Sequence, residues 1–223
     1  FVDSDDEVRA ETFCNCLSYL ENTGSDIVLY GINVIWVDEG LMKVDVPQQE
    51  RLGRLTPEKV SKLVRQRLFN YAWNKVYRVD FLNGRNRDGK VVRFVAEGMP
   101  CEDSIFNLSC VQNGATWCTV DYPGYVYYRT GGTLLSTYKK TGLRGLKLNS
   151  EAWSSYCAQT HSDPRPYEGW AILSEDDLWK REWENIWNKN SPYGLLERYR
   201  WLASAQRGVA WTVRTWLNAA VRT

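Results

Sequence analysis

The feature that most constrains the fold is a run rich in β-branched and aromatic side chains, DIVLYGINVIWV, at residues 26–37. A continuous apolar run of this kind is typical of a strand that is buried on both faces. Apolar residues at helical spacing precede it from Glu7 to Asn22, and Thr56-Pro57-Glu58 begins a basic helix after it. Because helix and strand alternate in this way up to residue 130, we predict an α/β fold with a mixed sheet flanked by helices.

The remaining elements are expected at shorter intervals. Residues 40–46 are predicted to pair with 26–37, as a hairpin or an extended partner. The other segments expected before residue 146 are a helical stretch at 71–82, strands at 91–95, 117–120 and 124–129, and a helix at 102–113. Beyond about residue 145 the sequence predicts only helices. The expected organisation is therefore a sheet-containing domain at 1–145 and an α-helical C-terminal appendage at 146–223.

Charge and cysteine content restrict the class of protein. The chain has 28 basic and 27 acidic residues, so its overall charge favours neither nucleic acid nor an anionic surface as a partner. None of the six cysteines forms a C-x-x-C pair, and Cys14 and Cys16 would point apart on a helix. We expect reduced cysteines in a cytoplasmic protein. The alternative is a secreted disulfide module that is glycosylated at Asn107, in the sequon Asn-Leu-Ser.

Carboxylates are concentrated near the start of the chain, in FVDSDDEV. The apolar pair Phe1-Val2 is expected to end a buried strand, and alternate strand residues share a face, so Asp3 and Asp5 would project together. Oxygen ligands in this arrangement suit Mg²⁺ or Mn²⁺. An EF-hand is excluded because its later ligands are missing. The alternative is that these acids, with Asp6, cap the helix that follows.

Two later groups of residues could also carry chemistry. Glu102 and Asp103 stand at a predicted loop-to-helix junction, where a carboxylate can act as a general base or cap the helix. Arg129 ends the aromatic run YVYYR, and it could contact phosphate together with Lys139 or Lys140 in the next loop. The alternative for this region is a strand followed by a polar loop without a ligand.

The order of five sequence blocks resembles a known family. FVDSDD, DIVLYG, AWNKVYRVDFL, EGMPCEDSIFN and YVYYRTGGTLLSTY, which span residues 1 to about 140, look like consecutive blocks of the family 2 glycosyltransferases. The resemblance implies a partial GT-A fold and inverting transfer of a sugar from a nucleotide-sugar donor, with a UDP-sugar as the first candidate. The implied acceptor is a hydroxyl of a saccharide or lipid-linked saccharide in bacterial surface polysaccharide synthesis.

The resemblance also implies roles for individual residues. Asp3 and Asp5, with a contribution from Asp6, would hold Mn²⁺ or Mg²⁺ on the diphosphate of the donor. Asp103 would be the catalytic base, and Glu102 would help to place the acceptor. The donor- and acceptor-binding positions of the family match Trp73, Asn74, Lys75 and Arg129.

In this family a nucleotide-binding half precedes the metal motif, so we expect the chain to be part of a longer enzyme and to bind nucleotide sugar poorly by itself. A metal-binding histidine is found late in some relatives. The only histidine here, His161, falls in the appendage and is expected to be a surface or capping residue.

The end of the appendage favours an anionic membrane surface. Residues 195–223 carry five Arg and one Glu, and Trp201, Trp211 and Trp216 are interleaved with them. Basic helices with Trp suit peripheral contact with the inner face of a cell membrane. The alternative is that the Trp side chains pack on the catalytic domain. A non-catalytic remnant that docks on a membrane or a partner enzyme is the alternative to catalysis.

Overall fold

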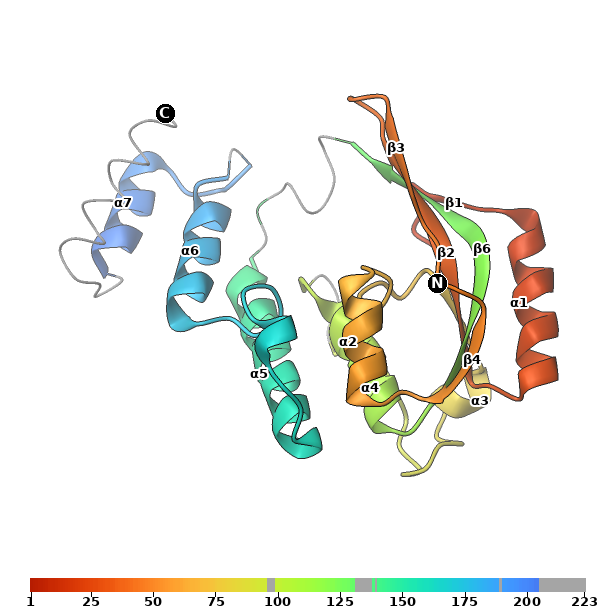
Figure 1. The fold of residues 1–223 in the computed structure, drawn as a ribbon. Coiled ribbons are helices and arrows are strands. Elements are labelled where there is room, and N and C mark those ends of the chain that lie inside the picture. The colour runs from red at the N-terminus through yellow and green to blue at the C-terminus, as the bar shows by residue number, and fades with distance from the viewer. Residues whose placement is uncertain (96–98, 131–137, 139, 189, 205–223) are drawn as a thin grey trace.

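The computed structural model describes residues 1–95, 99–130, 138, 140–188 and 190–204 (Figure 1). Helices and strands alternate through the first part of the chain, which confirms the predicted α/β class. The elements are β1 (Glu7–Val8), α1 (Ala10–Thr23), β2 (Ile27–Trp36), β3 (Leu41–Asp45), β4 (Glu50–Arg54), α2 (Pro57–Arg65), β5 (Lys75–Tyr77), α3 (Val79–Leu82), α4 (Glu102–Gln112), β6 (Thr116–Arg129), α5 (Gly142–Thr160), the 3₁₀ helix η2 (Arg165–Tyr167), α6 (Glu175–Ile186) and α7 (Leu195–Ser204).

The strands form one mixed sheet, as the sequence predicts. Its two long strands, β2 and β6, are parallel. Strands β3 and β5 pair antiparallel with the outer edge of β2, and β1 and β4 pair antiparallel with the outer edge of β6. The parallel register shifts on both sides of Gly31, where a Cβ atom would lie 2.9 Å from the carbonyl oxygen of Asp45. The predicted buried strand at 26–37 and its hairpin partner at 40–46 are therefore confirmed.

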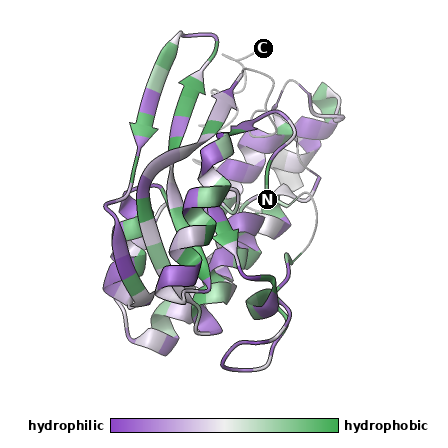
Figure 2. Ribbon diagram, turned by 90° about the vertical axis from the view of Figure 1, so that its right-hand side faces the viewer, coloured by the Kyte–Doolittle hydropathy of each residue, from purple (hydrophilic) through white to green (hydrophobic). Residues whose placement is uncertain are grey.

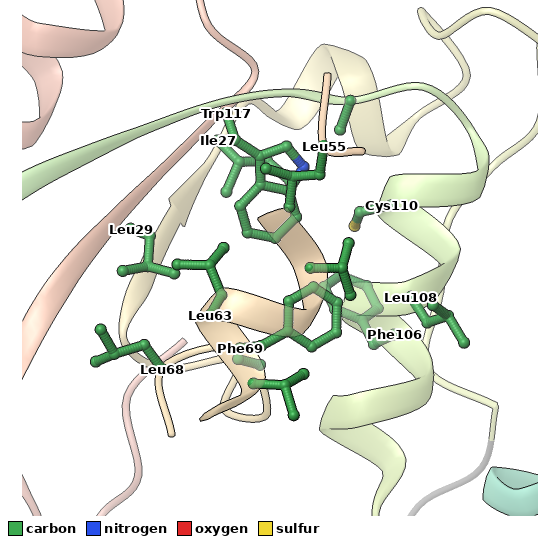
Figure 3. Packing of buried hydrophobic residues seen from close by; sticks show 14 of the residues in the cluster. Ile27, Leu29, Leu55, Leu63, Leu68, Phe69, Phe106, Leu108, Cys110 and Trp117 are labelled. Atoms are coloured by element: carbon green, nitrogen blue, oxygen red, sulfur yellow. The ribbon is translucent and has the colours of Figure 1, made fainter. Parts of the chain in front are cut away.

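Helices cover both faces of the sheet. Helix α1 lies on one face, α2 and α4 lie on the other, and α6 and α7 are furthest from the sheet (Figure 1). Hydrophobic residues, drawn in green, occupy several stretches of the strands (Figure 2). Figure 3 shows the main core, which lies between the sheet and helices α2 and α4. There Ile27 and Trp117 of the sheet lie beside Leu63 of α2 and Phe106 of α4.

Local signals explain where several helices begin and end. Helix α1 ends at Gly24, which has a φ of 63° and donates its N–H to Leu20 O at 2.9 Å. Helix α2 begins with Pro57 after Thr56, whose hydroxyl accepts from Lys59 N at 3.5 Å. His161 is the left-handed C-cap of α5 and is exposed, which confirms its predicted capping position.

Several predictions of secondary structure are wrong. Glu7 and Val8, expected at the start of the first helix, form strand β1, which pairs with β6. Residues 71–82 do not form one helix, because 75–77 become strand β5, paired with β2, and only Val79–Leu82 is helical. The segment 91–95 contains no strand. Instead, Val92 N donates to Leu82 O at 2.9 Å, which folds the segment back on α3. In addition, the two strands predicted at 117–120 and 124–129 are one continuous strand, β6.

The start of the chain also differs from the prediction. Phe1 and Val2 lie outside any strand, and they are 56% and 52% exposed. The Phe1 ring packs edge-on against Tyr77, Phe94 and Phe106, with centroid separations of 5.1–5.6 Å. The acidic residues that follow therefore approach the sheet from an aromatic cluster and not from the end of a strand.

The described part of the appendage is helical, as predicted. Trp153 and Tyr156 of α5 belong to the same buried cluster as the sheet, whereas Trp183 of α6 is buried in a separate cluster with Trp201 among its neighbours. The proposed domain boundary after residue 145 remains a prediction. Within the described ranges, no helix is long and apolar enough to cross a membrane. Trp211, Trp216 and the last three Arg residues lie outside those ranges.

Candidate active site

Asp103 is in the first turn of α4 and is half-buried. Its Oδ2 accepts a hydrogen bond from the main-chain N–H of Ala72, at 3.2 Å. Burial raises the pKa of Asp103, while the Ala72 N–H and the positive charge of Lys75 lower it. The charge of Asp3 raises the same pKa, so the structure brings the predicted base and the predicted metal motif within electrostatic range of each other. Glu102, the neighbouring acid, is also half-buried.

The acidic segment is held against β6. Tyr125 links two of its residues, because its hydroxyl accepts from Asp3 N at 3.0 Å and donates to Asp6 Oδ2 at 2.9 Å. The other oxygen of Asp6 accepts from Tyr128 N at 3.0 Å. Both oxygens of Asp6 are therefore engaged within the protein, and Asp6 anchors the segment on the strand.

Asp3 and Asp5 are better placed for a ligand than Asp6. Both are exposed, and partial burial followed by the charge of Asp5 raises the pKa of Asp3. A divalent cation would relieve this like-charge repulsion. Among the described residues no group of three or more His, Cys, Asp or Glu could hold a metal. Two carboxylates fit an ion that takes its other ligands from a diphosphate and water.

Trp73, Asn74 and Lys75, the predicted binding block, are buried in this structure. The Trp73 ring is stacked between Tyr71 and Tyr125, with centroid separations of 4.4 and 4.1 Å. Asn74 and Lys75 make hydrogen bonds to main-chain carbonyls of residues 68–71. All three side chains therefore contact other parts of the protein beside the candidate site.

Arg129 ends β6 and is exposed. Its guanidinium lies over the Trp36 ring, 5.8 Å from the centroid. Burial raises the pKa values of Tyr71 and Tyr127, and the charge of Arg129 opposes this shift. These two tyrosines are half-buried and belong with Trp73 to one aromatic group. Lys139 lies outside the described residues.

The sequence alone does not single out the tyrosines, and it suggests Asn107 only as the glycosylation site of an alternative secreted module. Asn107 is fully buried, and its Nδ2 donates to Phe69 O at 2.7 Å and to Tyr71 O at 3.0 Å. A glycan cannot be attached to this side chain in the folded protein. All six cysteines are free thiols. The alternative of a glycosylated disulfide module is therefore wrong. The sequence did hold a signal that Asn107 lies near the candidate base. Asn107 stands four residues after Asp103, and residues at this spacing lie on the same side of a helix.

One cavity of about 150 Å³ lies between β4 and α2. It is lined by Pro47, Gln48, Glu50, Leu52, Lys59, Lys62, Leu63, Gln66 and Thr119. None of the predicted site residues contributes to this lining.

Comparison with known proteins gives a match in structure only. The sequence matches no family profile and no curated protein. Residues 1–349 of S. aureus TarS, solved in complex with UDP-GlcNAc, superpose with a TM-score of 0.51 at 18% identity, over 92% of this chain and 54% of the TarS chain. The same part of TarS in complex with UDP gives a TM-score of 0.47 at 16% identity, over 91% and 52% of the two chains.

The chain has a glycosyltransferase-like fold. This agrees with the mixed sheet and its flanking helices. The chain spans about half the length of the TarS structures that it matches. At this level of identity the likeness concerns the fold alone.

Proposed function

We propose that this chain is the metal- and acceptor-binding part of an inverting, family 2-like glycosyltransferase. The observation that carries the proposal is the half-buried Asp103 at the start of α4, held by Ala72 N–H and coupled electrostatically to Asp3. A glycosyltransferase-like fold supports it. TarS was solved with UDP-GlcNAc, and this supports a UDP-sugar as the donor class.

Asp103 would act as the general base. The acceptor hydroxyl attacks the anomeric carbon of the donor as its proton passes to the Asp103 carboxylate. The bond between that carbon and the diphosphate oxygen breaks, and the nucleoside diphosphate leaves with the electron pair. One displacement inverts the configuration at the anomeric carbon. Because burial raises the pKa of Asp103, its carboxylate is a stronger base than one in water.

Asp3 and Asp5 would hold Mn²⁺ or Mg²⁺ against the diphosphate of the donor. The ion, when bound, offsets the negative charge that develops on the leaving group. Asp6 would fix the position of both carboxylates, because its own two oxygens are bonded to Tyr125 and Tyr128. Asp6 is therefore proposed to orient the metal site and not to ligate the ion.

The acceptor would lie beside the half-buried tyrosines Tyr71 and Tyr127. Aromatic side chains suit the apolar faces of sugar rings. Arg129 would contact donor phosphate. The buried residues 73–75 would pack behind Tyr71 and Tyr127 and hold these tyrosines in place. We propose a saccharide or lipid-linked saccharide acceptor in bacterial surface polysaccharide synthesis, at the cytoplasmic face of the membrane.

A screen of nucleotide sugars tests the proposal. The natural gene product is incubated with UDP-sugars and other nucleotide sugars, with Mn²⁺ or with a chelator, and release of nucleoside diphosphate is measured. We expect metal-dependent release from a UDP-sugar, weakened much more by Asp5→Asn than by the matched exposed control Asp121→Asn. The proposal fails if no donor reacts, or if Asp5→Asn and Asp121→Asn behave alike.

The second candidate is a non-catalytic docking protein. Leu195 and Leu196 at the start of α7 are 56% and 64% exposed, and this favours contact with a partner or a lipid surface. Removal of residues 195–223 should then abolish co-sedimentation with anionic liposomes or a partner glycosyltransferase. Absence of transfer activity together with this loss would favour the docking function.

A further inference from the structure

The turn that precedes β5, at residues 66–74, is held by four polar side chains. We call this group the polar clamp: Asn74, Lys75, Tyr77 and Asn107. Three of them are buried, and Tyr77 is half-buried. Asn74 Nδ2 and Lys75 Nζ both donate to Leu68 O at 3.0 Å. Lys75 Nζ and Asn107 Nδ2 donate to Phe69 O, at 3.2 and 2.7 Å, and to Tyr71 O, at 3.0 Å for Asn107. The single proton of the Tyr77 hydroxyl is shared between Ala72 O at 3.2 Å and Asn107 Oδ1 at 2.8 Å. The clamp therefore fixes the main chain through most of the turn.

Lys75 is the centre of the clamp. Its Nζ is surrounded by the three carbonyl oxygens of Leu68, Phe69 and Tyr71 and by Asn74 Oδ1, at 2.6 Å. All of these atoms are acceptors, so the geometry fits an ammonium, whose three protons can all be donated. Burial lowers the pKa of Lys75 to about 7, while the charge of Asp103 acts in the opposite direction. The oxygen cage favours the charged form further.

The clamp is connected to the candidate base in two ways. Ala72, within the turn, donates its N–H to Asp103 Oδ2 at 3.2 Å. Asn107 lies one helical turn after Asp103 in α4, and its Oδ1 accepts from the Tyr77 hydroxyl at 2.8 Å. Helix α4 therefore carries both Asp103 and Asn107. Asn107 belongs to the clamp, and the clamp holds the turn whose Ala72 N–H bonds to Asp103.

We propose that the polar clamp, with Lys75 at its centre, positions the Asp103 carboxylate for proton transfer. This inference rests on the proposed function, and Lys75 is a positioning residue in it. Core packing alone does not account for a lysine at this position, because a buried ammonium is more costly than an apolar side chain of similar volume. Burial raises the pKa of Asp103, and the charge of Lys75 acts against this shift.

Few other ionisable groups act on this pair. Lys75 faces Asp103 and Cys110 of α4, and Tyr77 of β5 is next to both. Burial raises the pKa of Cys110 to about 12 and the pKa of Tyr77 well above its ordinary value, so both stay neutral near pH 7. Asp103 also faces Asp3 and the amino group of Phe1. Lys75 is therefore the buried cation that opposes the charge of Asp103.

Two variants test the clamp without an activity assay. Lys75→Met removes the charge and its donors, and Tyr77→Phe removes only the hydroxyl that bonds to Ala72 O and Asn107. The matched controls are Lys62→Met, at an exposed lysine of α2, and Tyr156→Phe, at a buried tyrosine whose hydroxyl has no partner in the described parts of the chain. The carboxyl pKa of Asp103 is measured by carbon NMR, with Asp103→Asn for assignment, and exchange of the Ala72 amide is measured in the same samples.

Lys75→Met should raise the pKa of Asp103, and both variants should speed exchange of the Ala72 amide about tenfold relative to the two controls, as expected from loss of a buried hydrogen bond. The proposal is overturned if both readouts stay at the values of the controls. If Lys75→Met does not fold, Tyr77→Phe decides through amide exchange. In the active enzyme, both variants should lower kcat more than they change KM. Altered NMR readouts in a protein without transfer activity would reject the proposed function and leave the clamp intact.

Discussion

Trp153→Ala should destabilise the sheet and α5 together. Trp153 is fully buried, its ring lies 5.6 Å from that of Phe69 and 4.5 Å from that of Tyr167, and its Nε1 donates to Ser104 Oγ at 2.9 Å. Truncation of a buried tryptophan costs about 3–5 kcal/mol, and the Ser104 hydroxyl, which is left without its donor, adds about 1 kcal/mol. Domains have a free energy of unfolding of about 5–15 kcal/mol. The variant should therefore lose a large fraction of its stability.

Urea unfolding followed by far-UV circular dichroism measures this loss. With a urea m-value of about 2–3 kcal/mol/M, the midpoint should fall by about 2 M in a single transition. Trp153→Phe keeps most of the ring contacts, and in a double-mutant cycle with Ser104→Ala the coupling should be about 1 kcal/mol. A cost below about 1 kcal/mol, or a separate transition that leaves the sheet at its wild-type midpoint, would refute the reasoning. It would also mean that α5 does not support the helix that carries Asp103.

Three further predictions concern packing, pH and thiols. Gly145→Ala should destabilise the protein by about 1–3 kcal/mol in urea unfolding, although alanine favours helices, because the new Cβ would lie 2.6 Å from Pro100 Cδ and 2.8 Å from its carbonyl oxygen. Burial raises the pKa of Asp103 above its ordinary value of 3.8, so just above that pH the native state keeps a proton that the unfolded state has released. The free energy of unfolding of the wild type should therefore fall, relative to that of Asp103→Asn, as pH rises through the folded pKa. Urea titrations of both proteins over that pH range measure this, and a constant difference between their free energies of unfolding would contradict the prediction. A thiol reagent should modify Cys14 rapidly in the native protein, and protection of Cys14 would contradict its exposure. The thiols that should react only after unfolding are Cys16, Cys110, Cys118 and Cys157.

Elements with a strong local signal could be predicted from the sequence. The buried strand β2 is one continuous apolar run, α1 is followed by Gly24, and α2 begins at Thr56-Pro57. In each case the residues that determine the element are adjacent in sequence. The position of Asp103 at the start of α4 could be predicted for the same reason.

Elements that depend on distant partners could not be predicted. The apolar residues of 71–82 fit a helical period, but β5 is a strand because its three residues pair with β2. Strand β4 contains only one buried residue, Leu52, and is defined by its pairing with β6. The anchor of the acidic segment joins Asp6 to Tyr125, which are 119 residues apart.

The most direct test of the central claim is single-turnover sugar transfer by wild type and Asp103→Asn in the natural gene product, with the dissociation constant of the UDP-sugar donor measured in parallel. If Asp103 is the general base, Asp103→Asn should lower the rate of transfer by about 10²–10⁴ and leave donor binding unchanged. Transfer at the wild-type rate in the variant would contradict the account, because the acceptor proton would then be removed by another group.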